Sequence, residues 1–126
     1  IEDDESLRFT IKEILEKQNV QIMEAENGKV GMDILQNEEI KPDLILLDLM
    51  MPVMNGFEFL KAIRETELNS IPILVLTGAE LSGDEKTFLL GETQRILEKS
   101  EDTMSTIVNE VSNVIKASSF KNGDSK

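Results

Sequence analysis

Two short apolar runs, each ending in a polar residue, constrain the fold of this chain more than any other feature. The sequence DLILLDL occupies residues 43–49, and PILVLTG begins at Pro72. Near-continuous apolar runs of this length are typical of strands that are buried on both faces of a parallel sheet. The sequence therefore predicts one strand that ends at Asp48 and another that ends at Thr77.

Helical periodicity fills most of the remaining chain. Helices are predicted over residues 7–17 with Ser6 as N-cap, from Gly28 to about Gln36, over 57–65, weakly over 82–91, and from Ser100 through an apolar stripe at 104–115. Shorter strands are predicted over 20–25 and 95–99. This alternation predicts an α/β fold, with a doubly wound parallel sheet and helices on both of its faces.

The length and apolar content are those of one domain. The chain has 126 residues, of which 40% are hydrophobic, which is enough for one proper core. We expect a folded domain over residues 1–117 and a polar C-terminal tail over 118–126. No apolar run reaches the roughly 18 residues of a membrane span, so a cytoplasmic protein without a membrane span is expected.

Composition excludes several kinds of chemistry. The chain has no cysteine and no histidine, which argues against most zinc enzymes and against Ser-His and Cys-His catalysis. The formal net charge of −12 argues against direct binding to nucleic acid, because no basic stripe is available to displace counterions. Carboxylates, hydroxyls and ammonium groups remain, a set suited to oxygen-ligated cations and phosphoryl groups.

Polar residues of this kind stand at the predicted strand ends. They are Glu2, Asp3, Asp48, Thr77 and Lys99. The carboxyl ends of parallel strands meet at one edge of the sheet, where open α/β folds bind their ligands. Clustered carboxylates repel one another, so we expect a divalent cation to compensate them, either Mg²⁺ or Mn²⁺.

Such a cleft favours phosphoryl transfer to an aspartate. A carboxylate can attack phosphorus to form an aspartyl phosphate, and Asp48 is the candidate. The reaction needs mainly positioning and charge neutralisation, which a metal ion, Lys99 and the Thr77 hydroxyl could provide. Taken singly, each residue has a plainer interpretation, as a helix cap, a turn former, a strand residue or a solvated charge; their order along the chain favours the site.

At this point the sequence resembles the response-regulator receiver domain of two-component signalling over essentially its whole length. The resemblance lies in IEDDESLR, PDLILLDLMMPVMNG, PILVLTG and RILEKS. It implies a flavodoxin-like sheet of five parallel strands in the order 2-1-3-4-5. It also implies that Asp48 is the phosphoacceptor, and that Mg²⁺ is held by Asp48, by the backbone carbonyl of Met50, and by Glu2 with Asp3, or less favourably by Asp3 with Asp4.

The same resemblance implies partners and a switch. A histidine kinase or phosphotransfer protein would donate the phosphoryl group, and a downstream protein would bind the surface over residues 80–100. Thr77 and Lys99 would respond to phosphorylation. The chain is either a stand-alone receiver or part of a larger protein such as a hybrid histidine kinase.

Three departures from the family pattern affect these expectations. Ser100 stands where a proline usually follows the lysine, and Ile96 stands where an aromatic residue often serves the switch. The apolar residues of the first strand are largely absent, since the printed chain begins at Ile1. We therefore expect either a truncated sequence or a strand supplied by another copy of the chain.

Two other functions remain as alternatives. A phosphatase of the haloacid-dehalogenase type also uses a strand-end aspartate with Mg²⁺, but it has a second aspartate two positions on, where Met50 stands here. A receiver-like docking module that works without phosphorylation is the other alternative, suggested by Ile96 and Ser100. Met50, Met51 and Met54 are interpreted as packing residues rather than as soft-metal ligands.

Overall fold

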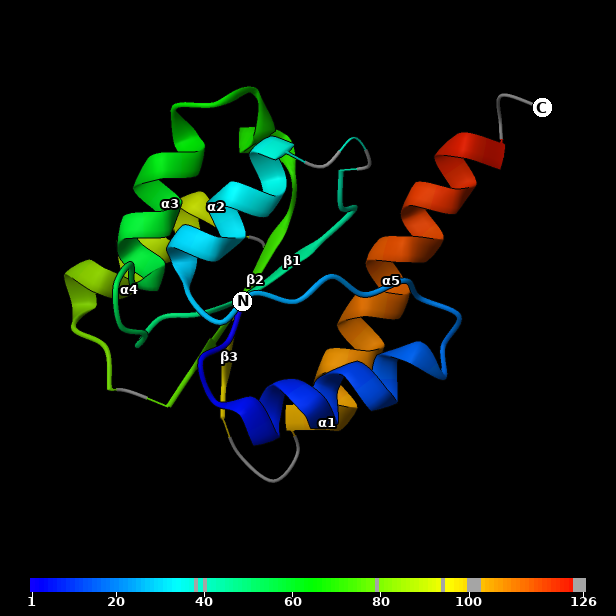
Figure 1. Ribbon diagram of the computed structural model, residues 1–126, viewed down its shortest axis with the longest axis horizontal. Helices are drawn as coiled ribbons and strands as arrows, with labels where there is room; N and C mark the ends of the chain where they lie inside the picture. The colour runs from blue at the N-terminus through cyan, green and yellow to red at the C-terminus, as the bar shows by residue number, and fades with distance from the viewer. Residues whose placement is uncertain (38, 40, 79, 94, 100–102, 124–126) are drawn as a thin grey trace.

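Three parallel strands form the centre of the molecule. The computed structural model describes residues 1–37, 39, 41–78, 80–93, 95–99 and 103–123. Its strands are β1 (Ile45–Asp48), β2 (Ile73–Thr77) and β3 (Arg95–Glu98), in the order β1-β2-β3 (Figure 1). Every residue of β2 is buried, because it is the middle strand of the three and is covered on both faces.

Helices cover both faces of this sheet, as the sequence predicts. They are α1 (Glu5–Glu16), α2 (Gly28–Asn37), α3 (Gly56–Arg64), the 3₁₀ turn η1 (Glu67–Ser70), α4 (Gly83–Glu92) and α5 (Thr103–Gly123). Figure 1 shows α1 and α5 together on one side of the strands, and α2, α3 and α4 on the other. The chain therefore has the predicted doubly wound α/β architecture, with three regular strands among the described residues.

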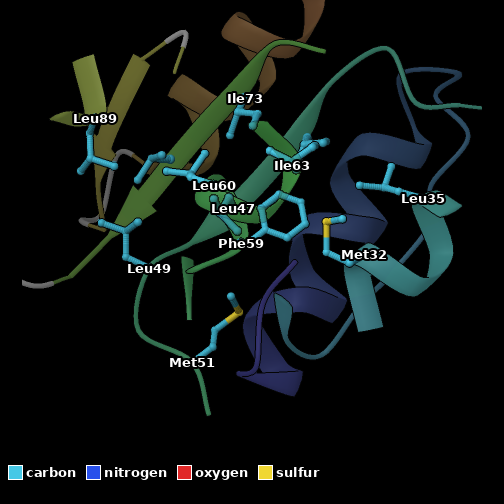
Figure 2. Close-up of a cluster of buried hydrophobic side chains, with 12 residues drawn as sticks. Met32, Leu35, Leu47, Leu49, Met51, Phe59, Leu60, Ile63, Ile73 and Leu89 are labelled. Atoms are coloured by element: carbon cyan, nitrogen blue, oxygen red, sulfur yellow. The ribbon is translucent and has the colours of Figure 1, made fainter. Parts of the chain in front are cut away.

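The alternation of side chains along the strands divides the core into two clusters. Leu47 and Val75 face the side of α2, α3 and α4, in one cluster with the fully buried Phe59. Figure 2 shows Leu47 near the Phe59 ring. Leu74 and Leu76 face the opposite side and pack against α1 and α5. Because successive strand residues point to opposite faces, one apolar run can supply both cores.

The position of the first strand is marked by Ile1 and Glu2. The backbone nitrogen of Ile1 donates to the carbonyl of Leu46 at 2.7 Å, and the carbonyl of Ile1 accepts from the Asp48 N–H at 3.0 Å. The next N–H, that of Glu2, donates to Ala25 at 3.0 Å. Ile1 and Glu2 thus lie between Ala25 and β1, the place that the order 2-1-3-4-5 assigns to the first strand.

The strand predicted over residues 20–25 is wrong as a regular strand. This segment receives one backbone bond from Glu2, and beside it lies a groove of about 520 Å³ whose lining includes Val20, Ile22 and Leu46. Without a full neighbouring ladder, the segment takes no regular β-structure. Its apolar side chains still pack against the cluster on the α1 and α5 side.

Helix ends differ from the prediction at two places. Helix α1 begins at Glu5 and is capped by Asp4, whose Oδ1 accepts from the Leu7 N–H at 3.1 Å, so Ser6 is not the N-cap. Helix α5 runs through Gly123, so it extends into residues 118–126, where the sequence predicts a polar tail. Ser100, the predicted cap of the last helix, lies outside the described residues. None of the described helices is long and apolar enough to cross a membrane.

Candidate functional site

Three carboxylates gather at the carboxyl end of β1. One oxygen from each of Glu2, Asp3 and Asp48 lies within 4.8 Å of the other two. Asp48 ends β1, and Glu2 is placed beside it by the backbone bonds of Ile1. The Glu2 and Asp48 side chains are buried, at 3% and 2% exposure, while Asp3 is exposed. The group therefore has a buried floor and one open carboxylate.

Lys99 joins this group from the far end of the chain. Its Nζ lies 3.0 Å from Glu2 Oε1 and 3.2 Å from Asp48 Oδ1. The backbone N–H of Lys99 donates to the carbonyl of Thr77 at 2.9 Å, which continues the pairing of β2 with β3. Residues predicted from three separate parts of the sequence therefore meet at one edge of the sheet.

The electrostatics of the group are those of a site with too many negative charges. The pKa of Glu2 is raised from its ordinary 4.5 to about 7, mainly by burial; the Asp4 N–H and Lys99 act to lower it, and the nearby Asp48 carboxylate acts to raise it. Burial also acts to lower the pKa of Lys99, but Glu2 and Asp48 outweigh it, so this pKa lies above its ordinary value. One ammonium does not neutralise three carboxylates.

A divalent cation fits this donor set. Glu2 Oε1 is buried and, apart from its ion pair with Lys99, accepts no hydrogen bond among the described residues. Lys99 offsets one negative charge at this oxygen, and a bound cation would offset the charge of the other carboxylates. With only oxygen donors available, the residues suit Mg²⁺, which commonly takes one or two carboxylates and keeps several waters.

Thr77 and Met50 lie at the same edge of the sheet. Thr77 ends β2 one position beyond Leu76, the residue that pairs with Asp48, and it is buried. Met50 follows Asp48 by two positions; its side chain is 64% exposed, so it does not pack in the core, whereas Met51 is buried and Met54 packs against the core. The chemical roles assigned to Thr77, Lys99 and the Met50 carbonyl remain predictions.

The role of Asp4 bears on which two adjacent acids, Glu2 with Asp3 or Asp3 with Asp4, are the candidate cation ligands. The Asp4 side chain caps α1, and its N–H donates to Glu2 Oε2 at 3.1 Å. Glu2 and Asp3, rather than Asp3 and Asp4, lie with Asp48 in the carboxylate group. The pair Glu2 and Asp3 is therefore favoured by the geometry.

Sequence reasoning missed Arg8, a basic residue that touches this region. Its Nη1 donates to the backbone carbonyl of Glu2 at 2.7 Å, and its Nε lies 3.4 Å from Glu24 Oε1. Arg8 thus fixes the backbone that carries the acidic pair. A single arginine on an amphipathic helix gives no signal in the sequence, because such a residue is usually a solvated charge.

Comparisons with known proteins show the family to which this fold belongs. Residues 1–112 match the family model of the response regulator receiver domain. The transcriptional regulatory protein CpxR of Escherichia coli is 37% identical over 81 residues, which are 64% of this chain and 34% of that protein. Hybrid signal transduction histidine kinase I of Dictyostelium discoideum is 37% identical over 94 residues, 70% of this chain and 5% of its own length.

Solved structures show the same fold. Chemotaxis protein CheY4 of Vibrio cholerae superposes with a TM-score of 0.76 at 29% identity, covering 90% of this chain and 92% of that one. The chain belongs to the response regulator receiver domain family. It spans about a third of the length of CpxR.

Proposed function

We propose that this chain accepts a phosphoryl group on Asp48 in a Mg²⁺-dependent reaction. The observation that carries the proposal is the meeting of Lys99 Nζ with both Glu2 and Asp48, beside three carboxylates whose oxygens lie within 4.8 Å of one another. Asp48, Glu2, Asp3 and the Met50 carbonyl would hold the ion. When bound, Mg²⁺ supplies positive charge that offsets the charge on the carboxylates and on the phosphoryl oxygens.

The protein's own part in the reaction is to place a nucleophile and stabilise charge. A carboxylate oxygen of Asp48 forms the new bond to phosphorus, while the bond from phosphorus to the donor breaks and the leaving group keeps the electron pair. With a histidine donor, the broken bond is P–N. Lys99, already 3.2 Å from Asp48 Oδ1, pairs with one phosphoryl oxygen, and the Thr77 hydroxyl donates to another.

The proposal includes partners of two kinds. A histidine kinase or phosphotransfer protein supplies the phosphoryl group in the cytoplasm, and a downstream protein binds the region of residues 80–100 without direct contact of this chain with nucleic acid. Support for the second surface lies in α4, where Leu90 is 66% exposed and Leu89 is the one buried residue of the helix. A helix with so small a share in the core can move at low cost.

The test is incubation with a small acyl phosphate and Mg²⁺, followed by intact-mass measurement. Wild type should gain the mass of one phosphoryl group and lose the gain when Mg²⁺ is chelated. Asp48→Asn should gain no phosphoryl mass. Asp33 is exposed and pairs with Lys29 on α2, so the control Asp33→Asn should behave as wild type. Full uptake by Asp48→Asn rejects the proposal.

A docking module that works without phosphorylation is the second candidate. One observation favours it: Ile96 is part of the packed cluster around Leu47, so no aromatic ring is available at that position to report phosphorylation. The same mass measurement separates the two functions, because a docking module takes up no phosphoryl group from any donor.

A further inference from the structure

The loop from Leu49 to Asn55 joins the candidate phosphoacceptor to α3, and its start is held firmly. The Gly56 N–H donates to the carbonyl of Leu49 at 2.9 Å. A Cβ on Gly56 would lie 2.6 Å from the carbonyl oxygen of Asp48, so α3 begins directly against the Asp48 backbone. Asn55 and Glu58 form a reciprocal cap at the same point.

The far part of the loop is strained. Val53 has a φ of 67°, a left-handed conformation that is unfavourable for a β-branched residue. The Met54 N–H donates to Pro52, two residues back, at 2.7 Å, which makes a tight three-residue turn around Val53. The Val53 side chain is 74% exposed, so its own packing does not stabilise the turn. Such backbone persists where the surroundings hold it in place.

Gly28, the first residue of α2, supplies that support. Its N–H donates to the carbonyl of Met54 at 3.0 Å. An added Cβ would lie 2.8 Å from both the oxygen and Cγ of Met54, which real contacts do not allow. No described glycine has a positive φ, so the close approach of the loop, rather than the backbone conformation, requires glycine at position 28.

We propose that Gly28 is a positioning residue for the cation site, an inference that rests on the proposed function. The contact of Gly28 with Met54 keeps the strained turn in place. This turn then fixes the loop that carries the Met50 carbonyl, two residues beyond Asp48. Helix α2 thereby takes part in binding the cation although none of its side chains belongs to the carboxylate group.

The test is Gly28→Ala, with Gly91→Ala as the matched control. The control adds the same methyl group to a helix, at a site where, outside the neighbouring backbone of that helix, no described atom lies within 4 Å of it. Titration of the folded proteins with Mg²⁺ alone should give a Kd raised on the order of 10-fold in Gly28→Ala, as expected when a contact that orients a metal site is lost. Gly91→Ala should keep the wild-type Kd.

A second readout needs no metal. Amide hydrogen exchange at Met54 should be faster in Gly28→Ala than in wild type, while exchange in the β2 strand stays slow, because the variant loosens the turn and leaves the core intact. A purely structural role would instead speed exchange throughout the domain and leave the Mg²⁺ affinity of the folded fraction unchanged.

Val53→Gly keeps the inference testable if Gly28→Ala does not fold. Glycine adopts the left-handed backbone without strain, so Val53→Gly alone should keep a Kd near wild type, since Gly28 still binds Met54. The double variant should fold but bind Mg²⁺ more weakly. Equal Mg²⁺ affinity in the single and double variants overturns the positioning role.

Failure of this inference is distinct from failure of the proposed function. Wild-type affinity for Mg²⁺ in folded Gly28→Ala overturns the role of Gly28, whether or not wild type takes up a phosphoryl group. Absence of phosphoryl uptake in wild type, together with weakened Mg²⁺ binding in Gly28→Ala, overturns the proposed function and supports the role of Gly28.

Discussion

Replacing Glu2 with glutamine should remove a pH dependence of stability that the crowded carboxylates create. In the metal-free protein, the pKa of Glu2 is raised from 4.5 to about 7, mainly by burial. A carboxyl whose pKa is higher in the folded state binds more protons when folded, so its contribution to stability is greatest at low pH and is lost as the pH rises from 4.5 to about 7.

The magnitude follows from the shift. At about 1.4 kcal/mol for each pKa unit, the raised pKa corresponds to about 3 kcal/mol in all, of which about 2 kcal/mol is lost between about pH 5 and about pH 8. Adding Mg²⁺ should oppose this loss, because the ion binds the deprotonated carboxylates of the folded protein, and its stabilising effect should grow with pH.

Urea unfolding of wild type and Glu2→Gln at the two pH values, with and without Mg²⁺, measures these quantities. The fall in unfolding free energy between the two pH values should be smaller in Glu2→Gln by about 2 kcal/mol. Glu13→Gln, on the exposed face of α1, should retain the wild-type fall. If Glu2→Gln retains the wild-type fall as well, the account of a proton-binding carboxylate cluster is wrong.

Two further predictions concern the charges and the core. Lys99→Ala leaves Glu2 and Asp48 without their ammonium partner, so the metal-free protein should lose about 3 kcal/mol of stability. Mg²⁺ should raise the melting temperature of this variant more than that of wild type. An equal rise in the two proteins would contradict the prediction. Phe59→Ala removes a fully buried ring and should cost about 3–5 kcal/mol in urea unfolding, and a cost below about 1 kcal/mol would contradict the described packing.

The strands and the meeting of the site residues could be predicted from the sequence because both depend on simple periodicity. The run that ends at Asp48 and the run that ends at Thr77 are apolar up to their last residue, so they indicate buried parallel strands. Parallel strands place their carboxyl ends together, and this alone brings Asp48 near Lys99. The order of these residues along the chain favoured one common site over separate roles for each of them.

Other features depend on neighbours that no local pattern reveals. Residues 20–25 have the composition of a strand but, among the described residues, accept a single backbone hydrogen bond from Glu2, so a regular ladder does not form. Asp4 and Ser6 are both suitable caps, and the choice of Asp4 depends on where α1 meets the acidic pair. The contact of Gly28 with Met54 joins the start of α2 to a loop residue 26 positions later in the sequence, and nothing local to either one predicts it.

Chemical trapping of the phosphorylated residue tests the central claim most directly. Treating the protein with an acyl phosphate and Mg²⁺ and then with borohydride reduces an aspartyl phosphate to homoserine, which peptide mass spectrometry locates in the sequence. The account predicts homoserine at position 48 of wild type. Its formation should depend on Mg²⁺, and peptides from Asp48→Asn should contain none. Homoserine at another aspartate, with Asp48 left unmodified, would contradict it.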